Sequence, residues 1–166
     1  TAVNLADYEA LARERLGAGA WAYLHGGAGD ELSLAGNRAA WSALRLWPRV
    51  LRPLSGGHTR VELLGRTLPH PILIAPMAYQ RLAHPDGERS VALAAAAQGA
   101  GLVLSAQTST PMQEVAPLLL GERERGPLWF QLYLQPDRGL TRSLVQQAEA
   151  AGFEALVLTV DAPVHG

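Results

Sequence analysis

Polar side chains follow the apolar runs in the second part of this sequence, where each run gives way to a loop. Four runs stand out: Ile72–Ala75, Leu102–Leu104, Leu128–Tyr133 and Ala155–Val160. Each of the last three has two polar side chains at or just beyond its end. These are Ser105 and Gln107 for the second run, Gln131 and Tyr133 for the third, and Thr159 and Asp161 for the fourth. Serine, threonine and glutamine donate and accept hydrogen bonds without a net charge. Three of them at neighbouring strand ends suit the edge of a flat heterocycle with alternating carbonyls and ring nitrogens. The alternative is that these side chains only cap the rim of the fold.

The spacing of the runs predicts repeated strand and helix units. Their first residues are 72, 102, 128 and 155, which gives intervals of 30, 26 and 27 residues, as one βα unit requires. The runs are apolar throughout rather than alternating, which is typical of parallel strands covered on both faces. Helix-start signals lie between them at Asp86, Thr110-Pro111 and Asp137. The carboxyl ends of such strands are where eight-stranded α/β barrels place their chemistry.

The chain length predicts half of such a barrel. A complete barrel takes about 250 residues, and this chain has 166. We therefore predict an α/β fold, a (β/α)8 TIM barrel of which this chain supplies a helical extension and about the first four βα units. The prediction is one domain over residues 1–166. Residues 1–68 form three helices and a barrel-floor hairpin around Gly65, and residues 69–166 form the first four barrel strands.

Composition excludes several classes of function. The net charge of -1 gives no electrostatic basis for binding nucleic acid. There is no cysteine for disulfides or thiolate metal sites, and no apolar run is long enough to cross a membrane. The strand ends carry no carboxylate cluster for a metal ion and no glycine-rich loop for a polyphosphate. We expect a cytoplasmic protein without a metal site.

The sequence resembles the FMN-dependent 2-hydroxy acid oxidases and dehydrogenases, which include glycolate oxidase, lactate oxidase, mandelate dehydrogenase and hydroxymandelate oxidase. The resemblance covers essentially the whole chain. Its motifs are Asp7–Ala10, Gly27–Glu31, Asn37-Arg38, Pro48–Leu51, Pro71–Pro76, Leu82–Glu88, Phe130–Tyr133, Ala151–Phe153 and Leu158–Pro163. The segment Met77–Arg81 is most similar to the hydroxymandelate oxidase branch.

The resemblance implies a cofactor, FMN, and a role for particular residues. The backbone of Pro76, Met77 and Ala78 matches the segment that lies against the flavin ring. Ser105, Gln131 and Thr159 match side chains that are hydrogen-bonded to the ring. Tyr23 matches a tyrosine that binds the substrate carboxylate, Tyr133 one near the substrate hydroxyl, and Asp161 the aspartate that supports the catalytic histidine. The family often has an aromatic residue near position 107, so Gln107 is expected to alter the pocket wall and the choice of substrate.

The implied reaction is the oxidation of a small (S)-2-hydroxy acid to the 2-oxo acid, with electrons passed to oxygen and hydrogen peroxide formed. The catalytic histidine, the flavin-side lysine and two arginines of the family have no counterpart in this chain. We expect them in a missing C-terminal half of the barrel, and we expect this chain to be stable only when paired. A homo-oligomer is also expected.

Alternatives remain open at this point. A dehydrogenase of the same family would pass its electrons to a quinone or cytochrome, and a half-barrel could serve only in flavin binding or assembly. Tyr23 could be a core tyrosine and Tyr133 could fill the barrel.

Overall fold

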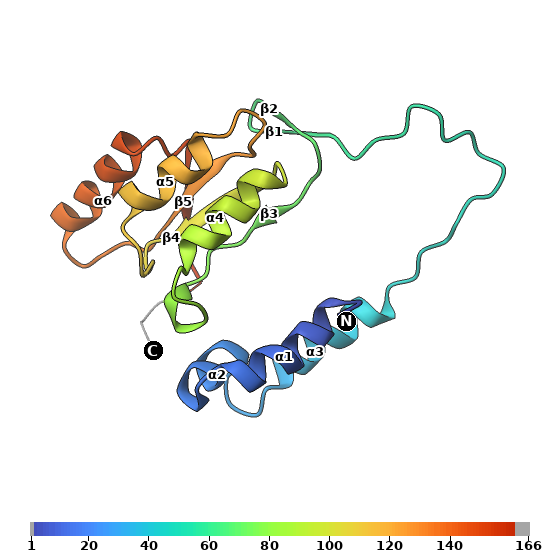
Figure 1. The fold of residues 1–166 in the computed structure, drawn as a ribbon, viewed down its shortest axis with the longest axis horizontal. Coiled ribbons are helices and arrows are strands. Elements are labelled where there is room, and N and C mark those ends of the chain that lie inside the picture. The colour runs from blue at the N-terminus through green and yellow to red at the C-terminus, as the bar shows by residue number, and fades with distance from the viewer. Residues whose placement is uncertain (1, 162–166) are drawn as a thin grey trace. The chain divides into compact units, whose positions relative to one another are not determined.

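The computed structural model describes residues 2–161 and divides the chain into two compact units, Thr1–Gly57 and His58–Gly166. Figure 1 shows the elements of both units. The predicted hairpin belongs to the second unit, so the boundary between units precedes it rather than following it. That the whole chain forms one domain stays a prediction.

The first unit contains the three predicted helices, α1 (Leu5–Arg15), α2 (Ala18–His25) and α3 (Leu32–Ala43). Asn4 caps α1: its side chain accepts from the Asp7 N–H at 3.0 Å, and the Asp7 side chain accepts from the Asn4 N–H at 3.3 Å. Helix α3 begins without a capping hydrogen bond from the side chain of its N-cap residue. The N-cap residue is Glu31, which has a left-handed backbone and accepts from the Gly27 N–H through its side chain at 2.9 Å. Residues 44–60 form neither helix nor strand.

The second unit begins with the antiparallel hairpin and continues with four parallel strands. The hairpin pairs β1 (Val61–Leu63) with β2 (Arg66–Leu68). The parallel sheet has the order β3-β4-β5-β6. Its strands are β3 (Leu73–Ile74), β4 (Gly101–Ser105), β5 (Leu128–Leu132) and β6 (Ala155–Leu158), and the intervening helices are η1 (Gln80–Leu82), α4 (Glu88–Ala97), α5 (Met112–Leu120) and α6 (Arg138–Ala150). The predicted alternation of strand and helix is confirmed.

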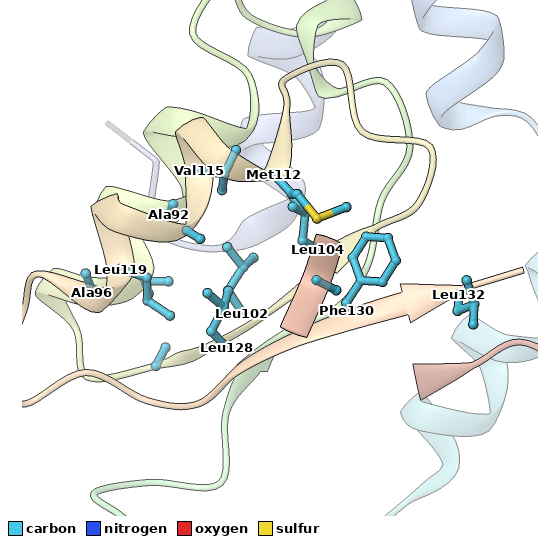
Figure 2. Packing of buried hydrophobic residues seen from close by; sticks show 14 residues of the cluster. Ala92, Ala96, Leu102, Leu104, Met112, Val115, Leu119, Leu128, Phe130 and Leu132 are labelled. Atoms are coloured by element: carbon cyan, nitrogen blue, oxygen red, sulfur yellow. The ribbon is translucent and has the colours of Figure 1, made fainter. Parts of the chain in front are cut away.

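The core lies between one face of this sheet and its helices (Figure 2). Alternate residues of β4 and β5 point to this side, because successive side chains of a strand face opposite ways. They are Leu102, Leu104, Leu128, Phe130 and Leu132, all at most 4% exposed, and they pack against α4 and α5. On the opposite face, the register aligns Ser105 with Gln131 and Gln131 with Val157. The apolar packing thus fixes which side chains share the other face.

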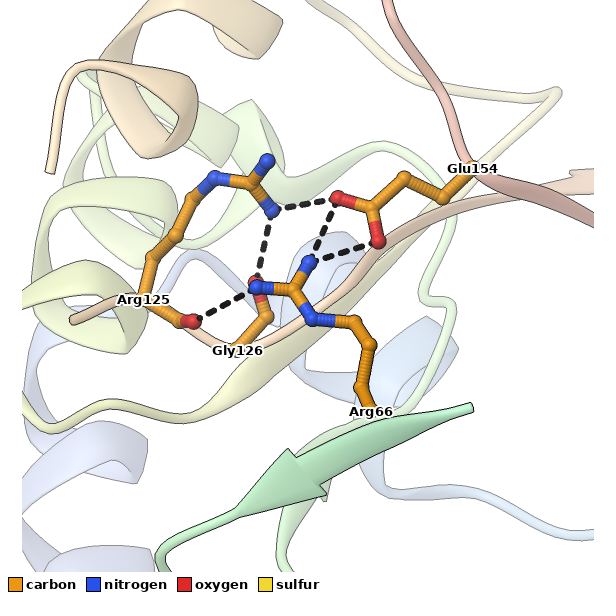
Figure 3. A network of polar contacts seen from close by, with 4 residues as sticks. All are labelled: Arg66, Arg125, Gly126 and Glu154. Carbon is orange, nitrogen blue, oxygen red and sulfur yellow. Dashed lines mark hydrogen bonds and ion pairs between the residues drawn. The ribbon is translucent and has the colours of Figure 1, made fainter. Parts of the chain in front are cut away.

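The amino-terminal edge of the sheet is tied to the hairpin by an ionic network (Figure 3). Glu154, just before β6, accepts from Arg66 Nη1 of β2 at 2.8 and 2.6 Å and from Arg125 Nη1 at 2.5 Å. Arg66 Nη2 also donates to the Arg125 carbonyl at 3.3 Å, and Arg125 Nη1 donates to the Gly126 carbonyl at 3.0 Å. Burial acts to raise the pKa of Glu154, but the two guanidinium groups outweigh it and hold that pKa below its ordinary value. The network therefore joins the hairpin to the amino-terminal edge of the sheet.

Candidate active site

Ser105, Gln131 and Thr159 form one hydrogen-bonded row across three neighbouring strands at the carboxyl edge of the sheet. The Ser105 hydroxyl donates to Gln131 Oε1 at 2.8 Å, and Gln131 Nε2 donates to Thr159 Oγ1 at 2.8 Å. Ser105 is 3% exposed and Gln131 6%, and Thr159 is half-buried. The row follows from the register: Ser105 lies opposite Gln131, and Thr159 lies two residues beyond Val157, the residue opposite Gln131. The three predicted ring-binding side chains are therefore together.

Among residues 2–161, the row has hydrogen-bonding groups that no other residue uses. Ser105 Oγ also accepts from the Gln107 N–H at 3.0 Å, but Gln131 keeps a second amide hydrogen, and Thr159 keeps its own hydroxyl proton. Hydroxyl and amide groups of this kind can match a ligand edge on which acceptors and donors alternate. The donor set thus fits a planar heterocycle with carbonyl oxygens and ring nitrogens.

The loop after β3 is fastened to the loop after β4. The Tyr79 N–H donates to the Gln107 carbonyl at 3.0 Å, and the Arg81 N–H donates to Ser109 Oγ at 3.1 Å. Tyr79 has a left-handed backbone, with φ of 53°, a conformation that costs a residue with a large side chain some energy. These bonds place the predicted segment Pro76, Met77 and Ala78 beside the β4 end of the row, and Met77 is 45% exposed.

A buried carboxylate that the sequence did not single out lies under these loops. Glu88, the first residue of α4, is 1% exposed, and its carboxylate accepts from Ser109 and Thr110 of the loop after β4. Burial acts to raise the pKa of Glu88, but hydrogen bonds from backbone N–H groups and from these hydroxyls outweigh it and lower the pKa below its ordinary value. An acidic residue in the first turn of a helix is common on any surface. The position of Glu88 in the sequence therefore did not distinguish it from an ordinary surface carboxylate.

A hollow of about 480 Å³ opens between α6 and the loops after β3, β4 and β5. Two glutamines and two tyrosines give it polar walls, and alanine and leucine side chains complete it: Tyr79, Ala106, Gln107, Tyr133, Gln135, Leu140 and Leu144. Gln135 Nε2 donates to the Tyr133 carbonyl at 3.2 Å. Gln107 and Tyr133, both predicted to contact the substrate, thus line the same hollow. Tyr79 and Gln135 line it as well, and the sequence did not indicate them.

The structure does not show two of the predicted site residues, Asp161 and Tyr23, in contact with the row. Asp161 is exposed and follows Thr159 by two residues, beyond the end of β6 at Leu158. Tyr23 lies on α2 in the first unit and is 53% exposed. Their roles stay predictions.

Comparison with known proteins identifies the family. A family model described as FMN-dependent dehydrogenase matches residues 12–166. L-lactate oxidase from Roseobacter sp. (strain GAI101) is 49% identical over 99% of this chain and 43% of its own length. 2-Hydroxyacid oxidase 2 from Rattus norvegicus is 38% identical over 99% of this chain and 45% of its own length.

Solved structures give the same result. The crystal structure of mandelate oxidase with 3,3-difluoro-2-hydroxy-3-phenylpropionic acid has a TM-score of 0.90 to this chain at 40% identity, covering 98% of this chain and 47% of that one. The chain thus spans less than half of the length of these relatives, and the predicted partial TIM barrel is confirmed. These matches show that the chain belongs to the FMN-dependent dehydrogenase family, whose cofactor is FMN.

Proposed function

We propose that the whole protein oxidises a small (S)-2-hydroxy acid to the 2-oxo acid and passes the electrons to oxygen, which forms hydrogen peroxide. The observation that carries this proposal is the row of Ser105, Gln131 and Thr159 at the carboxyl ends of three parallel strands. The names of similar proteins support it, since they include L-lactate oxidase and mandelate oxidase.

The row and the loop after β3 would hold the flavin. Ser105, Gln131 and Thr159 would bond the polar edge of the ring, and the backbone of Pro76, Met77 and Ala78 would lie against it. When bound, FMN accepts the two electrons that leave the substrate carbon. The residues of the row are neutral, so they bind the ring by hydrogen bonds alone and impose no fixed charge on it.

The substrate would be held by two tyrosines. The Tyr23 hydroxyl would donate to the substrate carboxylate, and Tyr133 would contact the hydroxyl on C2. Gln107, in the same wall as Tyr133, would contact the group that distinguishes one 2-hydroxy acid from another. The hollow has a volume of about 480 Å³, which lies in the range of small-molecule pockets, and we propose mandelate-like acids first, ahead of lactate and glycolate.

Asp161 would support a base supplied from outside this chain. A histidine that takes the substrate proton becomes positively charged, and a fixed carboxylate beside it stabilises that charge. Asp161 lies two residues beyond Thr159 and three beyond the end of β6, at the same edge of the sheet as the row.

The partner of this chain would be the C-terminal half of the barrel. On β6, Leu156 and Leu158 are 47% and 48% exposed, whereas their neighbours on β5, Phe130 and Leu132, are buried. A further βα unit would cover these leucines, as α4 and α5 cover β4 and β5. Homo-oligomerisation and a cytoplasmic location remain proposals. Among residues 2–161, no helix has both the length and the apolar character needed to cross a membrane.

The test uses the full-length protein loaded with FMN. It is mixed with (S)-mandelate, (S)-lactate and glycolate, and peroxide release is measured beside flavin reduction. Flavin reduction with rapid peroxide release supports the oxidase. Flavin reduction followed by slow reaction with oxygen, but fast reaction with a quinone or cytochrome, indicates a dehydrogenase instead. A protein that binds FMN and is reduced by none of these acids contradicts the proposed activity.

A further inference from the structure

Glu88 is a buried titratable group with no part in the chemistry proposed above. Four donors bond its carboxylate. Oε1 accepts from the Gln80 N–H at 3.2 Å, the Ser109 N–H at 2.8 Å and the Ser109 hydroxyl at 2.9 Å, and Oε2 accepts from the Thr110 hydroxyl at 2.9 Å. A buried charge is costly unless such bonds compensate it. The presence of a buried carboxylate with four hydrogen bonds at this position therefore calls for an explanation.

The donors come from two different loops. Gln80 belongs to the loop after β3, and Ser109 and Thr110 belong to the loop after β4. The Ser109 hydroxyl also accepts from the Arg81 N–H at 3.1 Å, so it connects the carboxylate back to the first loop. The carboxylate is the common acceptor through which the two loops are held together.

The same two loops carry parts of the candidate site. Gln80 follows Pro76–Ala78 by two residues, and Ser109 follows Gln107 by two residues. The Tyr79 N–H to Gln107 carbonyl bond, at 3.0 Å, joins the loops again between these points. We call the Glu88 carboxylate and its four hydrogen bonds the clamp. A shift of the clamp would be transmitted over a short stretch of backbone to Pro76–Ala78 and to Gln107.

We propose that Glu88 is a positioning residue for the cofactor: its buried carboxylate clamps the loops after β3 and β4 so that the Pro76–Ala78 backbone keeps the shape that the flavin ring requires. This inference rests on the proposed function, because it takes the flavin to lie against that backbone. Glu88 itself touches neither ring nor substrate.

Glutamine is the informative replacement. Glu88→Gln keeps the size of the side chain and one acceptor oxygen, but it removes the charge that strengthens all four bonds. The Thr110 hydroxyl can turn round to accept from the new amide, whereas the Ser109 backbone N–H cannot. The clamp is thus weakened without opening a cavity.

The experiment measures FMN affinity and the visible absorption spectrum of the bound flavin in the full-length protein. For Glu88→Gln we expect FMN binding to weaken about tenfold, because the bonds to the two loops lose the strength that the charge gives them, and the flavin bands to shift. The matched control is Glu114→Gln, in the first turn of α5, whose exposed carboxylate pairs with Arg89 at 3.3 Å. The control is expected to change neither quantity.

The outcomes separate the two proposals. If the wild-type protein does not bind FMN, the proposed function fails and this inference falls with it. If the wild type binds FMN and Glu88→Gln binds it equally with an unchanged spectrum, only the positioning role is overturned, even if the melting temperature drops. Should Glu88→Gln fail to fold, Thr110→Val removes one bond of the clamp, and the same comparison of affinity and spectrum decides.

Discussion

Replacing Gln131 by methionine tests the row at its centre. Gln131 is the one residue of the three that bonds to both others, at 2.8 Å in each case. Methionine has a similar length and no amide, so Gln131→Met removes both bonds while the packing volume stays nearly the same. The matched control is Gln147→Met on the exposed surface of α6.

The expected cost follows from which groups lose a partner. The Ser105 hydroxyl is 3% exposed and loses its acceptor, whereas the half-buried Thr159 can turn its hydroxyl toward solvent. One buried, unpaired donor costs about 1–3 kcal/mol, and the more apolar methionine offsets part of this. We expect Gln131→Met to lower the free energy of unfolding by about 1–2 kcal/mol, and to weaken FMN binding at least tenfold, since one ring contact is lost. Gln147→Met should stay within about 0.5 kcal/mol of the wild type.

The assay combines denaturant unfolding with FMN titration of the full-length protein. A second variant, Thr159→Val, and the double variant complete a thermodynamic cycle. If Gln131 acts through the row, the two changes are not additive, because each removes the same bond. Additive effects, or an FMN affinity unchanged in Gln131→Met, would refute the reasoning.

Three further predictions concern the scaffold of the second unit and one helix of the first. Glu154→Gln should lower the free energy of unfolding by about 1–2 kcal/mol at neutral pH, since the ionic network is partly exposed. Because the folded pKa of Glu154 is lowered from 4.5, this contribution is present above that value and is lost as pH falls through the folded pKa, so unfolding curves of wild type and variant should converge in acid. Phe130→Ala should cost about 3–5 kcal/mol in chemical denaturation, because Phe130 is fully buried. Gly126→Ala should abolish soluble expression, since a Cβ there would overlap the backbone at Gly101, whereas Gly19→Ala in α2 meets no atom within 4 Å and should raise the melting temperature.

The sequence predicted the elements of the second unit because local and tertiary signals agree there. The apolar runs became β4, β5 and β6, and Asp137 caps α6 by accepting from the Gly139 N–H at 2.7 Å. The run Ile72–Ala75 gave only the two-residue strand β3. Once the strands are paired in this parallel register, Ser105, Gln131 and Thr159 lie in one row as a direct consequence.

The features that the sequence did not predict depend on contacts between residues that are far apart in the chain. Thr110 reads as a helix cap, yet the N-cap of α5 is Pro111, and the Thr110 hydroxyl donates to Glu88. Glu88 and its partner Ser109 are 21 residues apart, and no local pattern connects them. Such polar clamps are recognised only when the loops that they join have been placed in space.

The two edges of the sheet are stabilised by different chemistry. At the floor, Glu154 and its two arginines form a charged network. At the mouth, Ser105, Gln131 and Thr159 are neutral and bond to one another through hydrogen bonds alone, as we propose that they bond to the flavin. The Glu88 carboxylate lies beneath the loops after β3 and β4 and accepts four hydrogen bonds from them. Substitutions at the floor should therefore change stability and leave FMN affinity intact, whereas substitutions in the row or at Glu88 should change FMN affinity even where the loss of stability is small.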